Sequence, residues 1–111
     1  MTTPFRVLEV ARAVVDEINT LVARSRPRLL YSDQITDSAG SITANIREAM
    51  GRRLGPERNQ FFRFALGSVE ETDERVRGNA KQKRIPKQTY WRLHNRLVLI
   101  RRMLNALMRR L

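Results

Sequence analysis

The chain has 111 residues, of which 41% are hydrophobic, and these values fit one domain with one core. It has no cysteine, which excludes disulfides, thiolate metal sites and cysteine nucleophiles, and no apolar run approaches the ~20 residues of a membrane span. Lysine and arginine number 22 against 11 acidic residues, and this net charge of +11 favours a nucleic acid or an anionic membrane as partner. The alternative is a basic face that contacts only solvent. The N-terminus lacks the features of a signal peptide, so we expect a cytoplasmic protein.

The first helix is predicted over residues 4–24. Its apolar residues repeat at spacings of three and four, which is typical of the seam of an antiparallel bundle: Leu8, Ala11, Val15, Ile18 and Val22. A second stripe of Val7, Val14 and Leu21 widens the apolar face, so we expect this helix to pack against two neighbours.

The second helix is predicted over residues 30–52. Its start is open between Pro27 and Asp33, because Ser32 or Asp33 can cap a helix and Pro27 can equally open one. Its apolar stripe is Ile35, Ala39, Ile42, Ile46 and Ala49. Gly40 costs ~1 kcal/mol of helix propensity relative to alanine, and close packing by a neighbouring helix is the expected compensation.

A corner between the second and third helices is predicted within residues 42–57. Gly51 and Gly55 provide the backbone freedom to end one helix, and Pro56 has the φ angle of a first helical turn. Asn45, Glu48 and Arg52 are expected to make structural hydrogen bonds and a salt bridge, at the corner or at a subunit contact, and with Gly51 they form the predicted structural corner.

The third helix is predicted over residues 56–80, and it carries two apolar stripes. One stripe is Phe61, Ala65, Ser68, Thr72 and Val76, and the other is Phe62, Leu66 and Val69. Two stripes exceed what one bundle core needs, so we expect Phe62, Leu66 and Val69 to face another subunit; a single wide core face is the alternative.

The fourth helix is predicted over residues 86–110, after a short basic linker. Its leucine-rich stripe has the most regular period of the chain: Tyr90, Leu93, Leu97, Ile100, Leu104, Leu107 and Leu111. Four helices with short connections predict a single all-α domain over residues 1–111, an up-down-up-down antiparallel four-helix bundle.

Three blocks of sequence resemble a known family. They are Ser41-Ile42-(x)2-Asn45-Ile46-(x)-Glu48-(x)2-Gly51-Arg52, then Phe61-(x)3-Ala65-Leu66-Gly67-Ser68-(x)2-Glu71, and finally Arg102-Met103-Leu104-Asn105-(x)-Leu107. In this order and spacing they resemble the bacterial four-helix bundle proteins associated with intervening sequences in 23S ribosomal RNA genes. The chain departs from the family pattern at Ala49, where glycine is commoner, and at Lys83-Arg84, where a glycine turn usually precedes the isoleucine.

The resemblance implies an all-α subunit that assembles as a ring-shaped homopentamer and is associated with ribosomal RNA. The accessory proteins of diversity-generating retroelements are similar in fold, and they are basic pentamers that assist a reverse transcriptase. The resemblance therefore also allows a second interpretation, in which the chain is a homo-oligomeric scaffold that docks a protein partner such as a reverse transcriptase.

Enzyme chemistry has little support in the sequence, and we expect no catalytic residues, no metal and no cofactor. The one histidine, His94, is more typical of a surface or core residue than of a general base. The Glu-x-x-His pairs of di-metal bundle enzymes are absent. The acidic row Glu70, Glu71, Asp73 and Glu74 is expected to pair with nearby arginines such as Arg63, Arg75 or Arg77.

Nucleic-acid binding, with RNA as the expected ligand, has more support. No acidic residue follows Glu74, and the predicted contact residues lie in that acid-free region: Lys81, Lys83, Arg84, Lys87, Arg92 and Arg96. Trp91 is expected to anchor the core or a subunit interface, with stacking on an unpaired base as the alternative. A membrane-surface role for the last helix is disfavoured, because the bundle core needs its leucine stripe.

Overall fold

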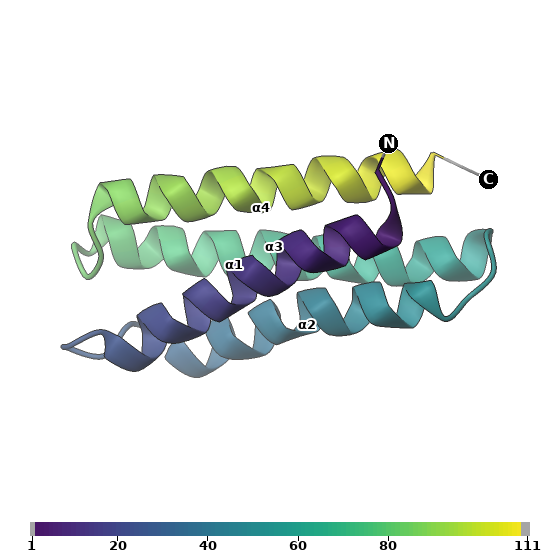
Figure 1. The fold of residues 1–111 in the computed structure, drawn as a ribbon. Helices are drawn as coiled ribbons and strands as arrows, with labels where there is room; N and C mark the ends of the chain where they lie inside the picture. The colour runs from purple at the N-terminus through teal and green to yellow at the C-terminus, as the bar shows by residue number, and fades with distance from the viewer. Residues whose placement is uncertain (1, 110–111) are drawn as a thin grey trace.

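The computed structural model describes residues 2–109, which form an antiparallel four-helix bundle about 45 Å long and 22 by 18 Å across. The helices are α1 (Pro4–Arg24), α2 (Ser32–Met50), α3 (Pro56–Lys81) and α4 (Lys87–Met108). Each helix packs against two others, since α1 and α3 both contact α2 and α4 (Figure 1). The predicted architecture of the subunit is therefore confirmed.

The helix ends follow local signals in the sequence. Thr3 caps α1 by accepting a hydrogen bond from the Arg6 amide at 3.1 Å, and Pro4 and Pro56 occupy the first turns of α1 and α3. The second helix is shorter than the predicted range 30–52, because Tyr31 adopts a left-handed conformation with φ of 57° and the helix starts after it. The end predicted for α4, Arg110, lies outside the described residues.

Only one glycine at the corner has a conformation that requires glycine. Gly55 has φ of +136°, which side chains rarely adopt, and it leads directly into α3. Gly51 has φ of −81° and ψ of −1°, an ordinary helical conformation. The prediction that Gly51 supplies special backbone freedom is therefore wrong.

Each helix contributes a regular pattern of buried residues to the core, and α1 buries residues of both its predicted stripes. The predicted stripe of α2 is buried in full, and so is the described part of the α4 stripe. The buried seam of α3 combines residues from both predicted stripes with polar residues that neither stripe contained. Its positions are spaced alternately by four and three residues: Arg58, Phe62, Ala65, Val69, Thr72, Val76 and Asn79.

Phe62 and Val69 lie inside this core, with 0% and 3% of their surface exposed. A side chain that is already covered within its own chain cannot present a face to a second subunit. The prediction that Phe62 and Val69 form a subunit interface is therefore wrong, while Leu66 is half-buried against the core.

Small polar side chains join α2 and α3 at the middle of the bundle. The hydroxyls of Ser38 and Thr72 lie 2.7 Å apart, and the Thr72 hydroxyl also donates to the carbonyl of Ser68 at 2.7 Å. Small residues therefore do allow these helices to approach closely. Gly40 plays no part, because it is exposed and a Cβ added to it would meet nothing within 4 Å; the close packing predicted for Gly40 is wrong.

Buried polar groups on α3 cap the C-terminus of α4. Arg58 donates to the carbonyl of Leu107 at 3.3 Å, and the Asn59 amide donates to the carbonyl of Met108 at 3.2 Å. The Arg58 guanidinium also lies 5.2 Å from the centre of the Phe62 ring. A positive charge at the negative end of a helix is stabilising, which explains how arginine is tolerated in the seam.

Candidate nucleic-acid interface

The loop between α1 and α2 and the loop between α3 and α4 lie together at one end of the bundle (Figure 1). Asn79, near the end of α3, joins them. Its side-chain oxygen accepts from the Leu30 amide at 2.8 Å, and its side-chain nitrogen donates to the carbonyls of Leu30 and Arg75, each at 3.0 Å. Its own backbone carbonyl accepts from the Arg84 amide at 2.8 Å. One fully buried residue therefore fixes both loops.

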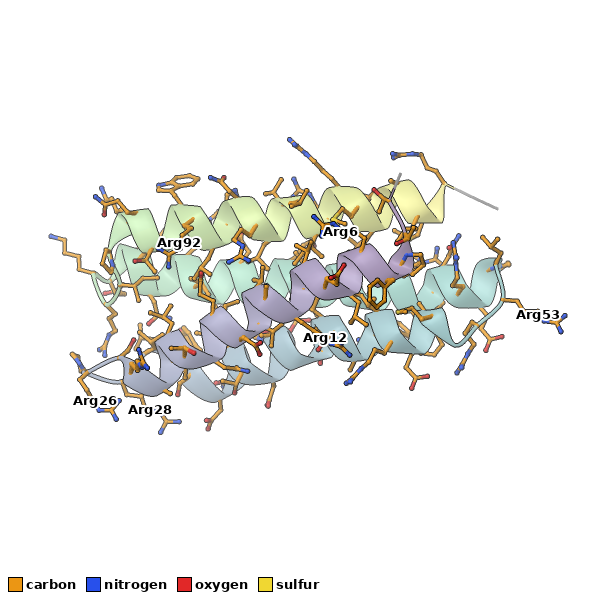
Figure 2. All side chains as sticks on the ribbon, viewed as in Figure 1. Arg6, Arg12, Arg26, Arg28, Arg53 and Arg92 are labelled. Atoms are coloured by element: carbon orange, nitrogen blue, oxygen red, sulfur yellow. The ribbon has the colours of Figure 1, made fainter. Side chains whose placement is uncertain are left out.

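The joined loops bring cations from separate parts of the chain to one surface, which we call the basic end: Arg26, Arg28, Lys81, Lys83, Arg84 and Lys87. The Arg84 guanidinium donates to the carbonyl of Arg28 at 2.9 Å, which ties the two arginine-bearing loops directly. Segments 25–31 and 82–86 contain no acidic residue, and the acid closest in sequence, Asp33, pairs with Arg28 at 2.8 Å. Figure 2 shows Arg26 and Arg28 at this end and Arg53 at the opposite end.

Four of the six predicted contact residues are therefore in one place. Lys81, Lys83, Arg84 and Lys87 are all exposed, and the last three line a shallow hollow of about 320 Å³ beside Ile85 and Pro86. Arg26 and Arg28 were not predicted. Arginines alternate with other residues in the segment Arg24-Ser25-Arg26-Pro27-Arg28, which is a signal in the sequence, but the contact of this segment with Arg84 is visible only in the fold.

Two loop residues at the basic end have unusual backbone conformations. Among the described residues, the non-glycine residues with positive φ are Tyr31, at 57°, and Lys83, at 60°. Left-handed backbone costs a non-glycine residue about 1–2 kcal/mol. At Lys83, a positive charge therefore occupies a position whose backbone conformation favours glycine.

The other two predicted contact residues, Arg92 and Arg96, lie on the side of α4 that faces α1. Both pair with the half-buried carboxylate of Glu17, at 3.4 Å and 3.2 Å respectively. An arginine that neutralises an acid of its own chain offers less charge to a phosphate. The structure therefore separates Arg92 and Arg96 from the basic end.

A polar and aromatic cluster joins α3 to the first turns of α4. The Tyr90 hydroxyl donates to Asp73 at 3.2 Å and accepts from Arg77 at 2.9 Å, while Nδ1 of His94 lies 2.8 Å from Asp73. Burial raises the pKa of Tyr90 above its usual value of 10.0; Asp73 adds to this effect, while the hydrogen bond and the charge of Arg77 oppose it. The hydrogen bond to Tyr90 likewise raises the pKa of Arg77. His94 is thus held in a structural network.

Trp91 lies beside this cluster and is 54% exposed. The prediction that it anchors the core is therefore wrong, and a subunit contact stays a prediction. Its ring centre is 5.2 Å from that of Tyr90 and 5.3 Å from that of His94, with interplanar angles of 60° and 89°.

The acidic row of α3 lies about two to three turns before Lys81, and the two line one hollow. Glu71 pairs with Arg75 at 3.3 Å and Asp73 pairs with Arg77 at 3.5 Å, as expected for residues four apart. Arg63, the third predicted partner, donates instead to Gln60 at 2.9 Å. Among residues 2–109, no group of three or more His, Asp or Glu side chains is placed to hold a metal ion.

The corner at the opposite end is held by its own residues. Arg52 lies 3.3 Å from Glu48 and 2.8 Å from Glu57, and its guanidinium is 4.9 Å from the centre of the Phe61 ring. Asn45 donates to the carbonyl of Ser41 at 2.8 Å, one turn earlier on the same helix. Within the chain, these contacts are structural.

Comparison with known proteins identifies the family. A solved structure from Bacteroides thetaiotaomicron, described as a protein of unknown function from the S23 ribosomal protein family, superposes with a TM-score of 0.87. It is 21% identical, and the match covers 96% of this chain and 97% of that one, so it shows a common fold. No curated protein matches the chain. Within residues 2–109, no helix is long and apolar enough to cross a bilayer. The sequence model of the 23S rRNA-intervening sequence protein family matches residues 4–106, and the chain therefore belongs to that family.

Proposed function

We propose that the protein is a non-enzymatic RNA-binding protein that holds phosphate groups at its basic end by charge and shape. The observation that carries the proposal is the joining of two loops into one acid-poor surface with six cations. Arginine and lysine side chains that outnumber the acids of a surface attract phosphates, and each phosphate that is neutralised releases counterions. The family name supports ribosomal RNA as the partner and the cytoplasm as the place of action.

The left-handed conformation of Lys83 supports a binding role rather than solubility. A charge that serves only solubility can occupy any exposed position. Solubility therefore does not explain a lysine at a position whose backbone conformation disfavours it. Strained positions persist where function uses the side chain they present. Lys83 lines the same hollow as Arg84 and Lys87, so its charge adds to theirs.

The test is a salt titration of binding to a labelled single-stranded RNA. Five cations of the basic end have no ion pair among the described residues, since Arg28 is paired with Asp33, and they predict a slope of about −3.5 in a plot of log affinity against log salt concentration, at about −0.7 for each phosphate. The variant Lys81/Lys83/Arg84/Lys87→Ala is expected to bring the slope to about −1.

A matched control removes four exposed arginines that have no ion pair within the described structure: Arg12, Arg47, Arg53 and Arg63. Changing these to alanine alters the net charge equally, and it should leave the slope nearly unchanged. An equal loss in both variants would show that binding depends only on net charge, and the proposal would then be wrong.

A homo-oligomer, with a ring of five as the expected form, is the second part of the proposal. With Phe62 and Val69 in the core, the apolar residue left exposed on the outer side of α3 is Phe64, at 49%. Light scattering should give about 65 kDa for five copies of the 13.0 kDa chain, and Phe64→Asp should lower this mass without loss of helical signal. A stable monomer for the unmodified protein would exclude the assembly, and with it a homo-oligomeric scaffold for another protein.

A further inference from the structure

Trp91 is a solvent-exposed aromatic residue next to the basic end. It follows Lys87 by four residues and precedes Asn95 by four, and all three side chains are exposed. Residues four apart lie on the same side of a helix, about 6 Å apart along its axis. The first turns of α4 therefore present a cation, a flat aromatic ring and an amide in succession toward solvent.

The ring of Trp91 is held in place before any ligand arrives. Tyr90 and His94 contact it at angles of 60° and 89°. Asp73 and Arg77 fix these two neighbours through hydrogen bonds of 2.8 Å to His94 and 2.9 Å to Tyr90. A ring that is already held loses little freedom when a flat ligand stacks on it.

The surrounding charge selects an anionic ligand. The chain has no acidic residue after Glu74, and Lys83 and Arg84 lie on the loop that leads into α4. Two carboxylates that contact α4 already have partners, since Asp73 contacts Arg77 and His94, and Glu17 contacts Arg92. An exposed aromatic ring one helical turn from a cation such as Lys87 is an arrangement with which proteins bind bases and phosphates of a single strand.

We infer that the nucleic acid bound at the basic end is single-stranded and that one unpaired base stacks on Trp91. This inference rests on the proposed RNA-binding function and specifies its substrate class. Phosphates lie against Lys87 and the loop cations, and the base covers the exposed part of the indole ring. A duplex hides the faces of its bases, so it reaches the cations without stacking on Trp91.

Intrinsic fluorescence tests the inference directly, because Trp91 is the one tryptophan of the chain. Three probes are compared: a single-stranded RNA of about 12 nucleotides, the same RNA annealed to its complement, and inorganic polyphosphate as a ligand with charge alone. The single strand should quench the fluorescence, and the duplex and polyphosphate should bind with little quenching.

Variants give the second measurement. Trp91→Ala should weaken single-strand binding at least about five-fold, the lower end of the range for one stacked base, and should leave polyphosphate binding unchanged. Trp91→Phe should retain most of the affinity. The control Leu99→Ala removes a 46% exposed apolar side chain two turns further along α4, and it should have no effect.

Equal quenching by all three probes, or unchanged single-strand affinity in Trp91→Ala, would overturn the stacking and leave charge-based binding intact. A lower mass of Trp91→Ala in light scattering would place the ring in a subunit contact and would also overturn it. If none of the probes binds at low salt, the proposed function itself fails.

Discussion

Replacing Asn79 should loosen the basic end and destabilise the whole bundle. The side chain is fully buried and makes three hydrogen bonds, two of them to the amide and carbonyl of Leu30. Alanine would leave both backbone groups without partners, and an unsatisfied buried group costs about 1–3 kcal/mol. Leu30 is half-buried, so water can partly replace the lost bonds. We expect Asn79→Ala to lower the free energy of unfolding by about 2–4 kcal/mol.

Urea denaturation followed by circular dichroism measures this loss. A change of about 3 kcal/mol should also lower the melting temperature by about 10 °C or more in a domain of this size. Native-state hydrogen exchange adds local resolution, because the Leu30 amide donates to Asn79 and should lose its protection in the variant.

Two controls separate hydrogen bonding from other effects. Asn79→Leu refills the volume without restoring the bonds, so it should remain destabilised; Asn19→Ala alters an exposed asparagine of α1 and should change stability by less than about 0.5 kcal/mol. Wild-type stability and Leu30 protection in Asn79→Ala would refute the reasoning, because the loops would then be held by other contacts.

Three further predictions concern the core, a titrating group and the strained lysine. Phe62→Ala should cost about 3–5 kcal/mol in urea denaturation with the mass of any assembly unchanged, because the ring lies wholly in the subunit core; a lower mass with stability retained would contradict this position. The raised pKa of Tyr90 means that the unfolded chain loses this proton first, so stability should fall as pH rises above about 10. In urea denaturation across that range, Tyr90→Phe should show a shallower fall, and equal slopes would count against the buried phenol. Lys83→Gly should raise the free energy of unfolding by about 0.5–1 kcal/mol, because left-handed backbone suits glycine, while the salt slope of RNA binding falls by about 0.7. A destabilised variant would show that the lysine side chain makes a stabilising contact.

The helices could be predicted from the sequence because their signals are local. The α4 stripe alternates spacings of three and four without interruption, and proline and glycine mark the start of α3. The seam of α3 was missed for a physical reason. Arg58 and Asn79 occupy core positions, and their polar side chains hide a regular period that hydrophobicity alone cannot reveal. Each is accommodated by a distant partner, such as the α4 terminus for Arg58 and Leu30 for Asn79.

The basic end was predicted only in part, because some of its cations are neighbours in the sequence and others are brought together only by the fold. The run from Lys81 to Lys87 is contiguous, so its cations could be grouped from the sequence alone. The pairing of Arg92 and Arg96 with Glu17 joins residues more than 70 positions apart, and the contact of Arg84 with Arg28 spans 56. Such contacts depend on how the helices are arranged, which no local pattern encodes.

The central claim is that RNA binds the basic end, and hydrogen–deuterium exchange with and without a single-stranded RNA tests it most directly. Peptides that cover residues 25–31 and 81–88 should exchange more slowly with RNA bound, because the ligand covers these loops and the first turn of α4. Peptides from the opposite corner, residues 50–56, should not change. Protection that is greatest at that corner, or that is spread evenly over the bundle, would contradict the claim.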